Sequence, residues 1–207
     1  MSDAHTPLRL AVFLSGSGRT LENLLEKIAA GSLDAEVVLV VSSREDVRGT
    51  AIARQAGLPT VVLNPRHSSA TLVSEQAFAA CRERQVDLVV LGGYLHLLEV
   101  PNDFAGRVVN IHPSLLPAFG GKGYHGMAVH RAVLARGCTV SGCTVHLVDE
   151  IYDNGRVLAQ EAVKVVAGDT PDTLAARVFA AECSLLPAAI QAIALGQHGP
   201  LPLGSCG

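Results

Sequence analysis

The chain has 207 residues and a formal net charge of -3, and 49% of its residues are hydrophobic. This length and composition suit one sizeable globular core and exclude a disordered chain. The acidic balance and the absence of Trp argue against a nucleic-acid surface or a stacking platform for bases. No apolar run reaches transmembrane length, and residues 1–7 are polar without a signal-peptide core. We therefore expect a cytoplasmic protein that binds neither nucleic acid nor membrane.

The cysteines and histidines do not predict a metal site. The cysteines are odd in number and lack zinc-site spacing, so we expect reduced thiols, mostly in the core, at Cys81, Cys138, Cys143, Cys183 and Cys206. His125, His130 and His146 have neither i,i+4 helical spacing nor a paired Cys pattern, so we predict no metal.

Continuous apolar runs alternate with helical patterns through the first half of the chain. Strands are expected at residues 9–14, 36–42, 60–64, 86–93 and 107–112, with helices at 20–31, 49–57 and 71–84. Strands that are apolar on both faces and alternate with helices predict a parallel sheet with helices on both faces.

The rhythm changes after residue 138. Residues 139–149 and 156–166 read as strands whose connection is too short for a helix, which predicts an antiparallel hairpin added to the sheet. A final helix follows, with Thr170 as its cap and Pro171 at its first position. We expect one domain at residues 8–195, with disordered ends at 1–7 and 196–207.

The stretch SGSGRT at residues 15–20 joins the first strand to the first helix. Glycines let the backbone approach a ligand closely, and the amides of the following helix favour an anion such as phosphate. We favour an anion site here, and the alternative is a Gly-rich turn that binds nothing. The dinucleotide fingerprint fails because no third glycine follows, and the triphosphatase loop fails because Arg19 follows Gly18.

Asn110 and His112 end the fifth expected strand, where ligands bind in sheets of this type. Residues two apart in a strand point to the same side, so an amide and an imidazole lie together and can donate to an oxyanion. Downstream, a carboxylate at Asp153 would hold and charge the imidazole if it lay nearby. The alternative is that Asp153 only shapes an acidic turn.

NIHPSLLPAFGGKGYHG at residues 110–126, with SGSGRT upstream and SGCTVHLVDEIYDNG at 141–155, closely resembles the folate-dependent formyltransferases. The resemblance covers roughly residues 8–195 and implies a single-domain, Rossmann-like α/β fold. It implies transfer of the formyl group of 10-formyltetrahydrofolate, a co-substrate, to the amine of glycinamide ribonucleotide. It also allows a homodimer.

The same resemblance assigns roles residue by residue. The family's catalytic Asn, His and Asp fall on Asn110, His112 and Asp153. Ribonucleotide binding falls on a phosphate loop and on a glutamate of the last helix: Gly18, Arg19, Thr20 and Glu182. Folate binding falls on Asn110 and two segments: Leu95, His96, Leu97 and Leu98, and Asp149, Glu150, Ile151, Tyr152 and Asp153.

Some positions depart from the family pattern. Relatives often carry an Arg at the position of His96. They also carry a substrate-binding Arg near the position of Thr71, and the nearest arginine in this chain is Arg66. Arg156 is unusual as well. A deformylase-like hydrolase and another small-molecule formyltransferase stay open as alternatives. A tRNA-directed relative is disfavoured because we see no C-terminal domain. An NADP reductase using Arg44 and a non-catalytic sensor fit the motifs less well.

Overall fold

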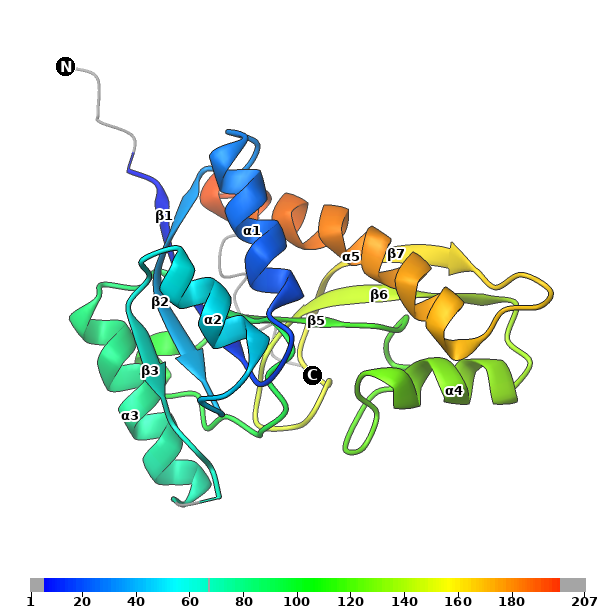
Figure 1. Ribbon diagram of the computed structural model, residues 1–207, viewed down its shortest axis with the longest axis horizontal. Helices are drawn as coiled ribbons and strands as arrows, with labels where there is room; N and C mark the ends of the chain where they lie inside the picture. The colour runs from blue at the N-terminus through cyan, green and yellow to red at the C-terminus, as the bar shows by residue number, and fades with distance from the viewer. Residues whose placement is uncertain (1–5, 67, 198–207) are drawn as a thin grey trace, which may run out of the picture.

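A computed structural model describes residues 6–66 and 68–197. Within these residues the chain forms one seven-stranded sheet in the order β3-β2-β1-β4-β5-β6-β7 (Figure 1). The first five strands are parallel: β1 (Leu8–Leu14), β2 (Ala35–Ser42), β3 (Thr60–Val62), β4 (Leu88–Leu91) and β5 (Val108–His112). The predicted Rossmann-like α/β class is confirmed.

The last two strands, β6 (Val140–Leu147) and β7 (Val157–Lys164), form the predicted antiparallel hairpin. β6 also runs antiparallel to β5, with Asn110 opposite His146 and His112 opposite Thr144. Directly opposed residues share one face of a sheet, so this register brings β6 side chains to the two residues singled out on β5.

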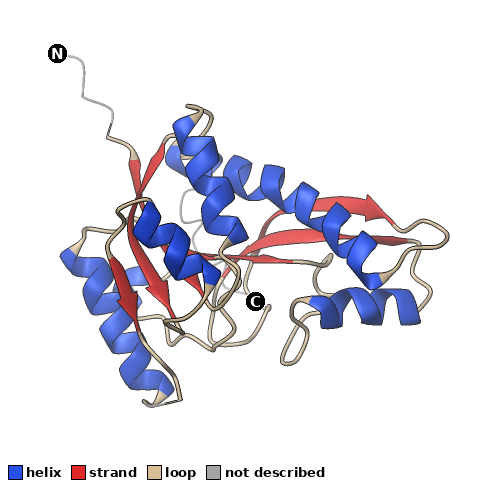
Figure 2. Ribbon diagram, viewed as in Figure 1, coloured by secondary structure: helices blue, strands red, loops and turns tan. Residues whose placement is uncertain are grey.

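Helices cover both faces of the sheet (Figure 2). One core cluster joins the strands to α1 (Arg19–Ala29), α2 (Arg48–Gln55), α4 (Met127–Ala135) and α5 (Pro171–Ala194). A second cluster on the other face includes Ala77, Phe78 and Cys81 of α3 (Ala70–Glu83), which pack with Phe13 and Leu39. Both faces of the central strands are thus covered by apolar side chains, as their unbroken apolar runs predict.

Two features of the helices differ from expectation. No element was expected at residues 127–135, where α4 buries Val129, His130 and Val133. We expected no segment of transmembrane length, yet α5 is long and apolar enough, by length and composition, to cross a membrane. That expectation was wrong in its literal form. Leu174, Val178 and Ile190 of α5 are fully buried in the main core, so its apolar stripe packs on the sheet.

The expected disordered ends at 1–7 and 196–207 fall mostly outside the described residues, because residues 1–5 and 198–207 are not described. The described cysteines are free, with Cys81 and Cys143 buried and Cys138 and Cys183 half-buried. Burial raises the thiol pKa of Cys81 and of Cys143 to about 12, so neither is a ready nucleophile. Cys206 lies outside the described residues.

Candidate active site

The carboxyl ends of β1, β4 and β5 meet at one edge of the sheet. β2 and β3 are added on one side of β1, whereas β4 and β5 are added on its other side. The direction in which successive strands are added therefore reverses between β1 and β4. Loops diverge at such a switch point and leave a crevice for ligands. The loop at residues 15–18, the segment at 92–98 and the chain after His112 all start from this edge.

Ser15 ties the first two of these segments together. Its backbone N–H donates to the carbonyl of Gly93 at 3.2 Å, and its hydroxyl accepts the Leu95 N–H at 3.1 Å. The Ser43 hydroxyl, from the end of β2, donates to the same Ser15 oxygen at 2.7 Å. The expected phosphate loop and the expected folate segment are therefore held in a fixed relation to each other.

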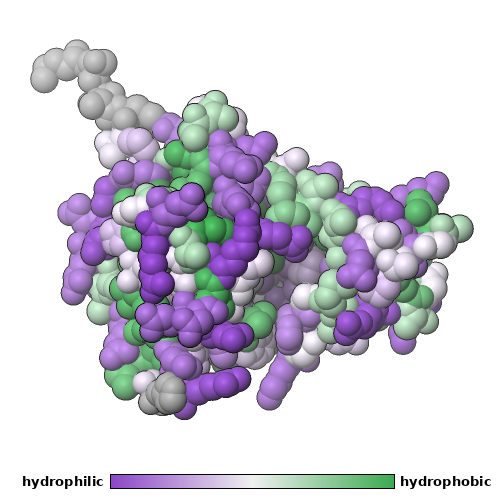
Figure 3. All heavy atoms as spheres, in the orientation of Figure 1, coloured by the Kyte–Doolittle hydropathy of each residue, from purple (hydrophilic) through white to green (hydrophobic). Residues whose placement is uncertain are grey.

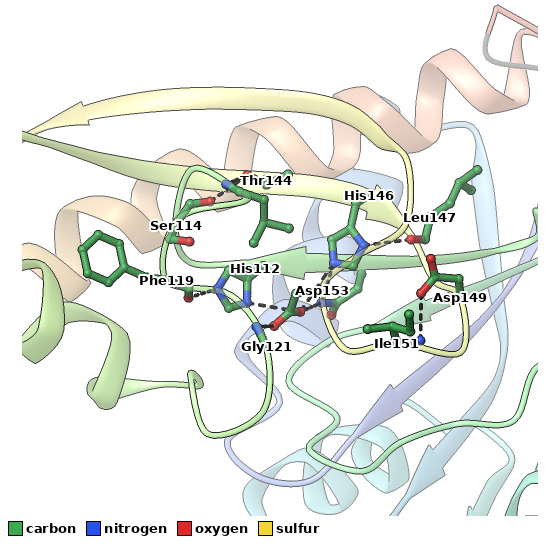
Figure 4. Close-up of polar contacts among 12 residues, drawn as sticks. His112, Ser114, Phe119, Gly121, Thr144, His146, Leu147, Asp149, Ile151 and Asp153 are labelled. Atoms are coloured by element: carbon green, nitrogen blue, oxygen red, sulfur yellow. Dashed lines mark hydrogen bonds and ion pairs between the residues drawn. The ribbon is translucent and has the colours of Figure 1, made fainter. Parts of the chain in front are cut away.

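Asp153 contacts both Asn110 and His112 of β5, and Figure 4 shows its carboxylate beside the His112 ring. Its Oδ1 lies 3.4 Å from Asn110 Nδ2 and 3.4 Å from His112 Nδ1. Its Oδ2 accepts the Gly121 N–H at 2.9 Å. Of the two interpretations that the sequence left open for Asp153, the structure brings the carboxylate to the imidazole rather than leaving it in a remote turn.

His146 is a fourth member of this group, although its sequence context suggested only a metal-ligand role, which its spacing disfavoured. It is 2% exposed, and its Nδ1 lies 2.8 Å from the Leu147 carbonyl, which can only accept. Nδ1 therefore carries the proton, and Nε2 accepts the Asn110 amide at 3.0 Å. The sequence could have indicated this role, because pairing the predicted hairpin strand β6 antiparallel to β5 places His146 opposite Asn110.

The ring of His112 is fixed by a similar contact. Its Nε2 lies 2.8 Å from the carbonyl of Phe119, so Nε2 is the protonated donor. Nδ1 is the ring atom that faces Asp153. His112 is 3% exposed and its ring is held on both sides, so the orientation of Nδ1 is preorganised.

Asp153 is held as an anion in this cluster. Burial raises the pKa of its carboxyl, but the contact with the His112 ring, the His112 charge and the Gly121 N–H together lower the pKa well below its ordinary value. The backbone of Asp153 has a φ of 54°, a left-handed conformation that Asp tolerates better than most residues.

The loop that carries Asp153 is shaped by its own side chains. Asp149 Oδ1 accepts the Ile151 N–H and Oδ2 accepts the Asn154 side-chain amide, both at 2.9 Å. Glu150 points to solvent, and Ile151 is 64% exposed. Asp149 therefore supports the turn that delivers Asp153, while Ile151 offers an uncovered apolar surface beside it.

Two adjoining cavities open next to the cluster and share Tyr94, Asn110, Tyr152 and Asp153 in their walls. The larger, of about 380 Å³, extends along the loop at residues 121–126 and is lined by Leu95; the smaller, of about 60 Å³, is lined by His96, Leu97 and Leu98. The leucines expected to flank the folate thus divide between two cavities, and Leu98 is almost wholly core. A recess also separates the side of the molecule that carries α1 and α2 from the lobe that carries α4 (Figure 3).

The expected phosphate loop lies at the start of α1. Gly18 has a φ of 70°, and a Cβ there would lie 2.4 Å from the Gly49 Cα, so the fold itself requires glycine. The helix has no side-chain cap, which leaves its first amides to water or a ligand. Thr20 and Glu182 line one small crevice between α1 and α5. Burial raises the pKa of Glu182 to about 7, against the opposing charges of Arg19 and His112.

The positions that depart from the family pattern are spread around the folate segment. His96 has a lowered pKa because of burial and the charge of Arg66. Thr71 donates to Glu99 at 2.9 Å, which engages its hydroxyl within the protein. Arg156 is exposed beyond the loop. No group of three or more His, Cys, Asp or Glu side chains in residues 6–66 and 68–197 is arranged to hold a metal ion.

The profile of the family described as "Formyl transferase" matches residues 8–190. The chain belongs to the formyl transferase family. A relative from Arabidopsis thaliana, "Phosphoribosylglycinamide formyltransferase, chloroplastic", is 44% identical over 92% of this chain and 67% of its own length. The human "Trifunctional purine biosynthetic protein adenosine-3" is 39% identical over 93% of this chain but only 19% of its own length. The family predicted from the sequence is confirmed.

Solved structures of formyltransferases have the same fold as this chain. The glycinamide ribonucleotide transformylase 1 of Symbiobacterium toebii has a TM-score of 0.86 and 37% identity, and the match covers 94% of this chain and 90% of that one. A formyltetrahydrofolate deformylase from Pseudomonas syringae has a TM-score of 0.79 at 24% identity, which shows a shared fold alone.

Proposed function

We propose that this protein transfers the formyl group of 10-formyltetrahydrofolate to the primary amine of glycinamide ribonucleotide, a step of purine biosynthesis. The observation that carries the proposal is the meeting of Asn110, His112 and Asp153 beside a cavity of about 380 Å³. The names of the relatives from Arabidopsis thaliana and Symbiobacterium toebii support this choice of substrates.

The chemistry needs one new bond and one broken bond. The ribonucleotide amine attacks the formyl carbon and forms a tetrahedral intermediate with a negative oxygen. In the free protein Asn110 Nδ2 and His112 Nδ1 each lie 3.4 Å from Asp153 Oδ1, and in the proposed step each turns its N–H from that carboxylate to the new negative oxygen. One such donor typically lowers a barrier by ~3 kcal/mol. The carbon–N10 bond then breaks, and the proton lost by the amine ends on the folate nitrogen.

Asp153 and His146 support this step from either side. As an anion, Asp153 holds the His112 ring with its Nδ1 toward the carboxylate, and it can hold a water that relays the amine proton. His146 accepts from Asn110 and so fixes which way the amide points. In this mechanism no residue of the cluster forms a covalent bond to the formyl group.

The two substrates approach from opposite sides of the cluster in this proposal. The ribonucleotide phosphate binds Gly18, Arg19 and Thr20, and Glu182 contacts the same substrate. The folate lies against residues 95–98 and 149–153, with no metal involved. A cytoplasmic location and a homodimer are parts of the proposal; among relatives, the plant proteins are named chloroplastic.

The test is consumption of 10-formyltetrahydrofolate by purified protein with and without glycinamide ribonucleotide. Consumption that depends on the amine supports the transferase. Release of formate at the same rate without the amine would instead identify a deformylase-like hydrolase. Turnover only with a different amine would identify another small-molecule formyltransferase.

A further inference from the structure

Arg19 is an unpaired cation at the start of α1. Its guanidinium makes no hydrogen bond and no ion pair with the residues that the structure describes, and the side chain is exposed. Its neighbour Arg48 is different, because its guanidinium donates to the Ser17 carbonyl and forms a two-pronged ion pair with Glu22 at 2.6 and 2.8 Å. Of these two arginines beside the loop, only Arg19 keeps its donors free.

The guanidinium of Arg19 is nevertheless held in place. Its central carbon lies 3.9 Å from the centre of the Phe179 ring on α5. A cation stacked on an aromatic face is attracted by the ring quadrupole, and a planar guanidinium keeps its N–H edges open while its face is covered. The stack therefore fixes the plane of Arg19 without using its hydrogen-bond donors.

α5 carries Phe179 and Glu182 one turn apart, on neighbouring positions of one face. Both line the crevice that Thr20 and Ile111 also line, so this face of α5 borders the expected phosphate loop. Glu182 does not form an ion pair with Arg19. The Glu182 carboxylate thus leaves the guanidinium available for an outside anion.

We infer that Phe179 is a positioning residue that holds the Arg19 guanidinium ready to bind the phosphomonoester of the ribonucleotide through two parallel N–H donors. This inference rests on the proposed function for the identity of the substrate. A fixed planar fork matches phosphate oxygens and loses little freedom on binding. Phe179 then sets how strongly the enzyme distinguishes a phosphorylated ribose from its unphosphorylated counterpart.

The experiment compares Phe179→Leu, which keeps apolar bulk, with Phe179→Tyr, which keeps the ring face. The probes are ribose 5-phosphate and ribose, titrated by calorimetry, and the KM for glycinamide ribonucleotide. We expect Phe179→Leu to raise the Kd for ribose 5-phosphate and the KM for the ribonucleotide roughly three- to tenfold. The kcat and the KM for the folate should not change, and Phe179→Tyr should match the parent protein.

Variants of Arg19 complete the test. Arg19→Gln should weaken ribose 5-phosphate binding roughly 10- to 100-fold, and Phe179→Leu should then add nothing. Arg19→Lys, at an exposed position, keeps the charge but not the stacked fork, and it tests the inference even if Phe179→Leu does not fold. Arg84→Gln, at the far end of α3, is the control for loss of one positive charge.

The outcomes separate the inference from the proposed function. If the parent protein binds ribose 5-phosphate but does not formylate the ribonucleotide, the proposed function fails and the inference survives in the Kd values. If formylation is normal and Phe179→Leu binds ribose 5-phosphate as the parent does, the inference is overturned alone. It is also overturned if Phe179→Leu weakens binding as much in the Arg19→Gln background as in the parent.

Discussion

At the scale of single residues, Asp153 uses its two oxygens differently. Oδ2 is held at ordinary hydrogen-bond distance by the Gly121 N–H, whereas Oδ1 lies 3.4–3.7 Å from Asn110, His112 and His146. Oδ2 thus links the loop of Asp153 to the loop of Gly121, whereas Oδ1 has three side-chain nitrogen atoms around it at long distance. Loose contacts of this kind are common before substrate arrives and tighten in the complex.

Asp153 and His112 should therefore act as a unit. We expect Asp153→Asn to lower kcat by roughly 10³-fold or more with the fold retained, and the double variant with His112→Ala to be little worse than the more damaged single variant. Steady-state kinetics of the set checks this. Glu83→Gln, which removes an exposed carboxyl at the end of α3, is the control. Losses that multiply in the double variant would show that the two residues act independently.

His146 should matter through Asn110. His146→Phe keeps a ring but removes the acceptor for the Asn110 amide, so we expect kcat to fall about tenfold, the value of one hydrogen bond, with both KM values unchanged. The side-chain amide signals of Asn110, followed by ¹⁵N NMR, should move in this variant. Unmoved amide signals together with an unchanged kcat would reduce His146 to a packing residue.

These residues differ in how far the sequence could locate them. Asn110 and His112 follow from strand alternation, and His146 follows from the antiparallel register once the hairpin is accepted. The contact with Asp153 does not, because it depends on a left-handed residue in a loop and on the path of a second loop at Gly121. No local pattern encodes such a meeting of two loops.

At the scale of elements, a helix could be predicted from the sequence where its first residues carry a capping signal, and was missed where they do not. α5 begins at a capping box formed by Thr170 and Thr173, with Pro171 at its first position, and these signals were readable. α4 is preceded by Gly126, which has a φ of 52° and provides no capping side chain. A nine-residue helix without a start signal looks like a continuation of the preceding glycine-rich loop.

Glu182 on α5 should make stability depend on pH. Its pKa is raised from 4.5 to about 7 in the folded protein, so between these pH values the unfolded chain releases a proton that the folded protein keeps. Stability from this group is full below pH 4.5 and is lost as the pH rises to 7, by about 3 kcal/mol.

Urea unfolding of the parent protein and of Glu182→Gln, at several pH values between 4 and 8, measures this effect. The difference in unfolding free energy between the two proteins should shift against the parent as the pH rises, and it should level off above pH 7. A difference that is constant with pH would show that Glu182 is ionised throughout the range.

At the scale of the whole molecule, the strand order reverses between β1 and β4, so the proposed phosphate loop and the proposed folate segment after β4 start from the same edge of the sheet. In the proposed function both substrates are bound together, and the formyl group passes directly between them. Initial-rate plots at varied concentrations of each substrate should give intersecting lines. Parallel lines would indicate a covalent formyl-enzyme, which no part of this account supplies.

The most direct measurement follows the formyl group itself. With ¹³C-labelled 10-formyltetrahydrofolate and glycinamide ribonucleotide, ¹³C NMR and mass spectrometry of the products should show the label bound to the ribonucleotide amine. The Asp153→Asn variant should leave it on the folate over the same period. Label recovered as free formate, or the same yield from Asp153→Asn as from the parent protein, would contradict a direct transfer carried out by Asn110, His112 and Asp153.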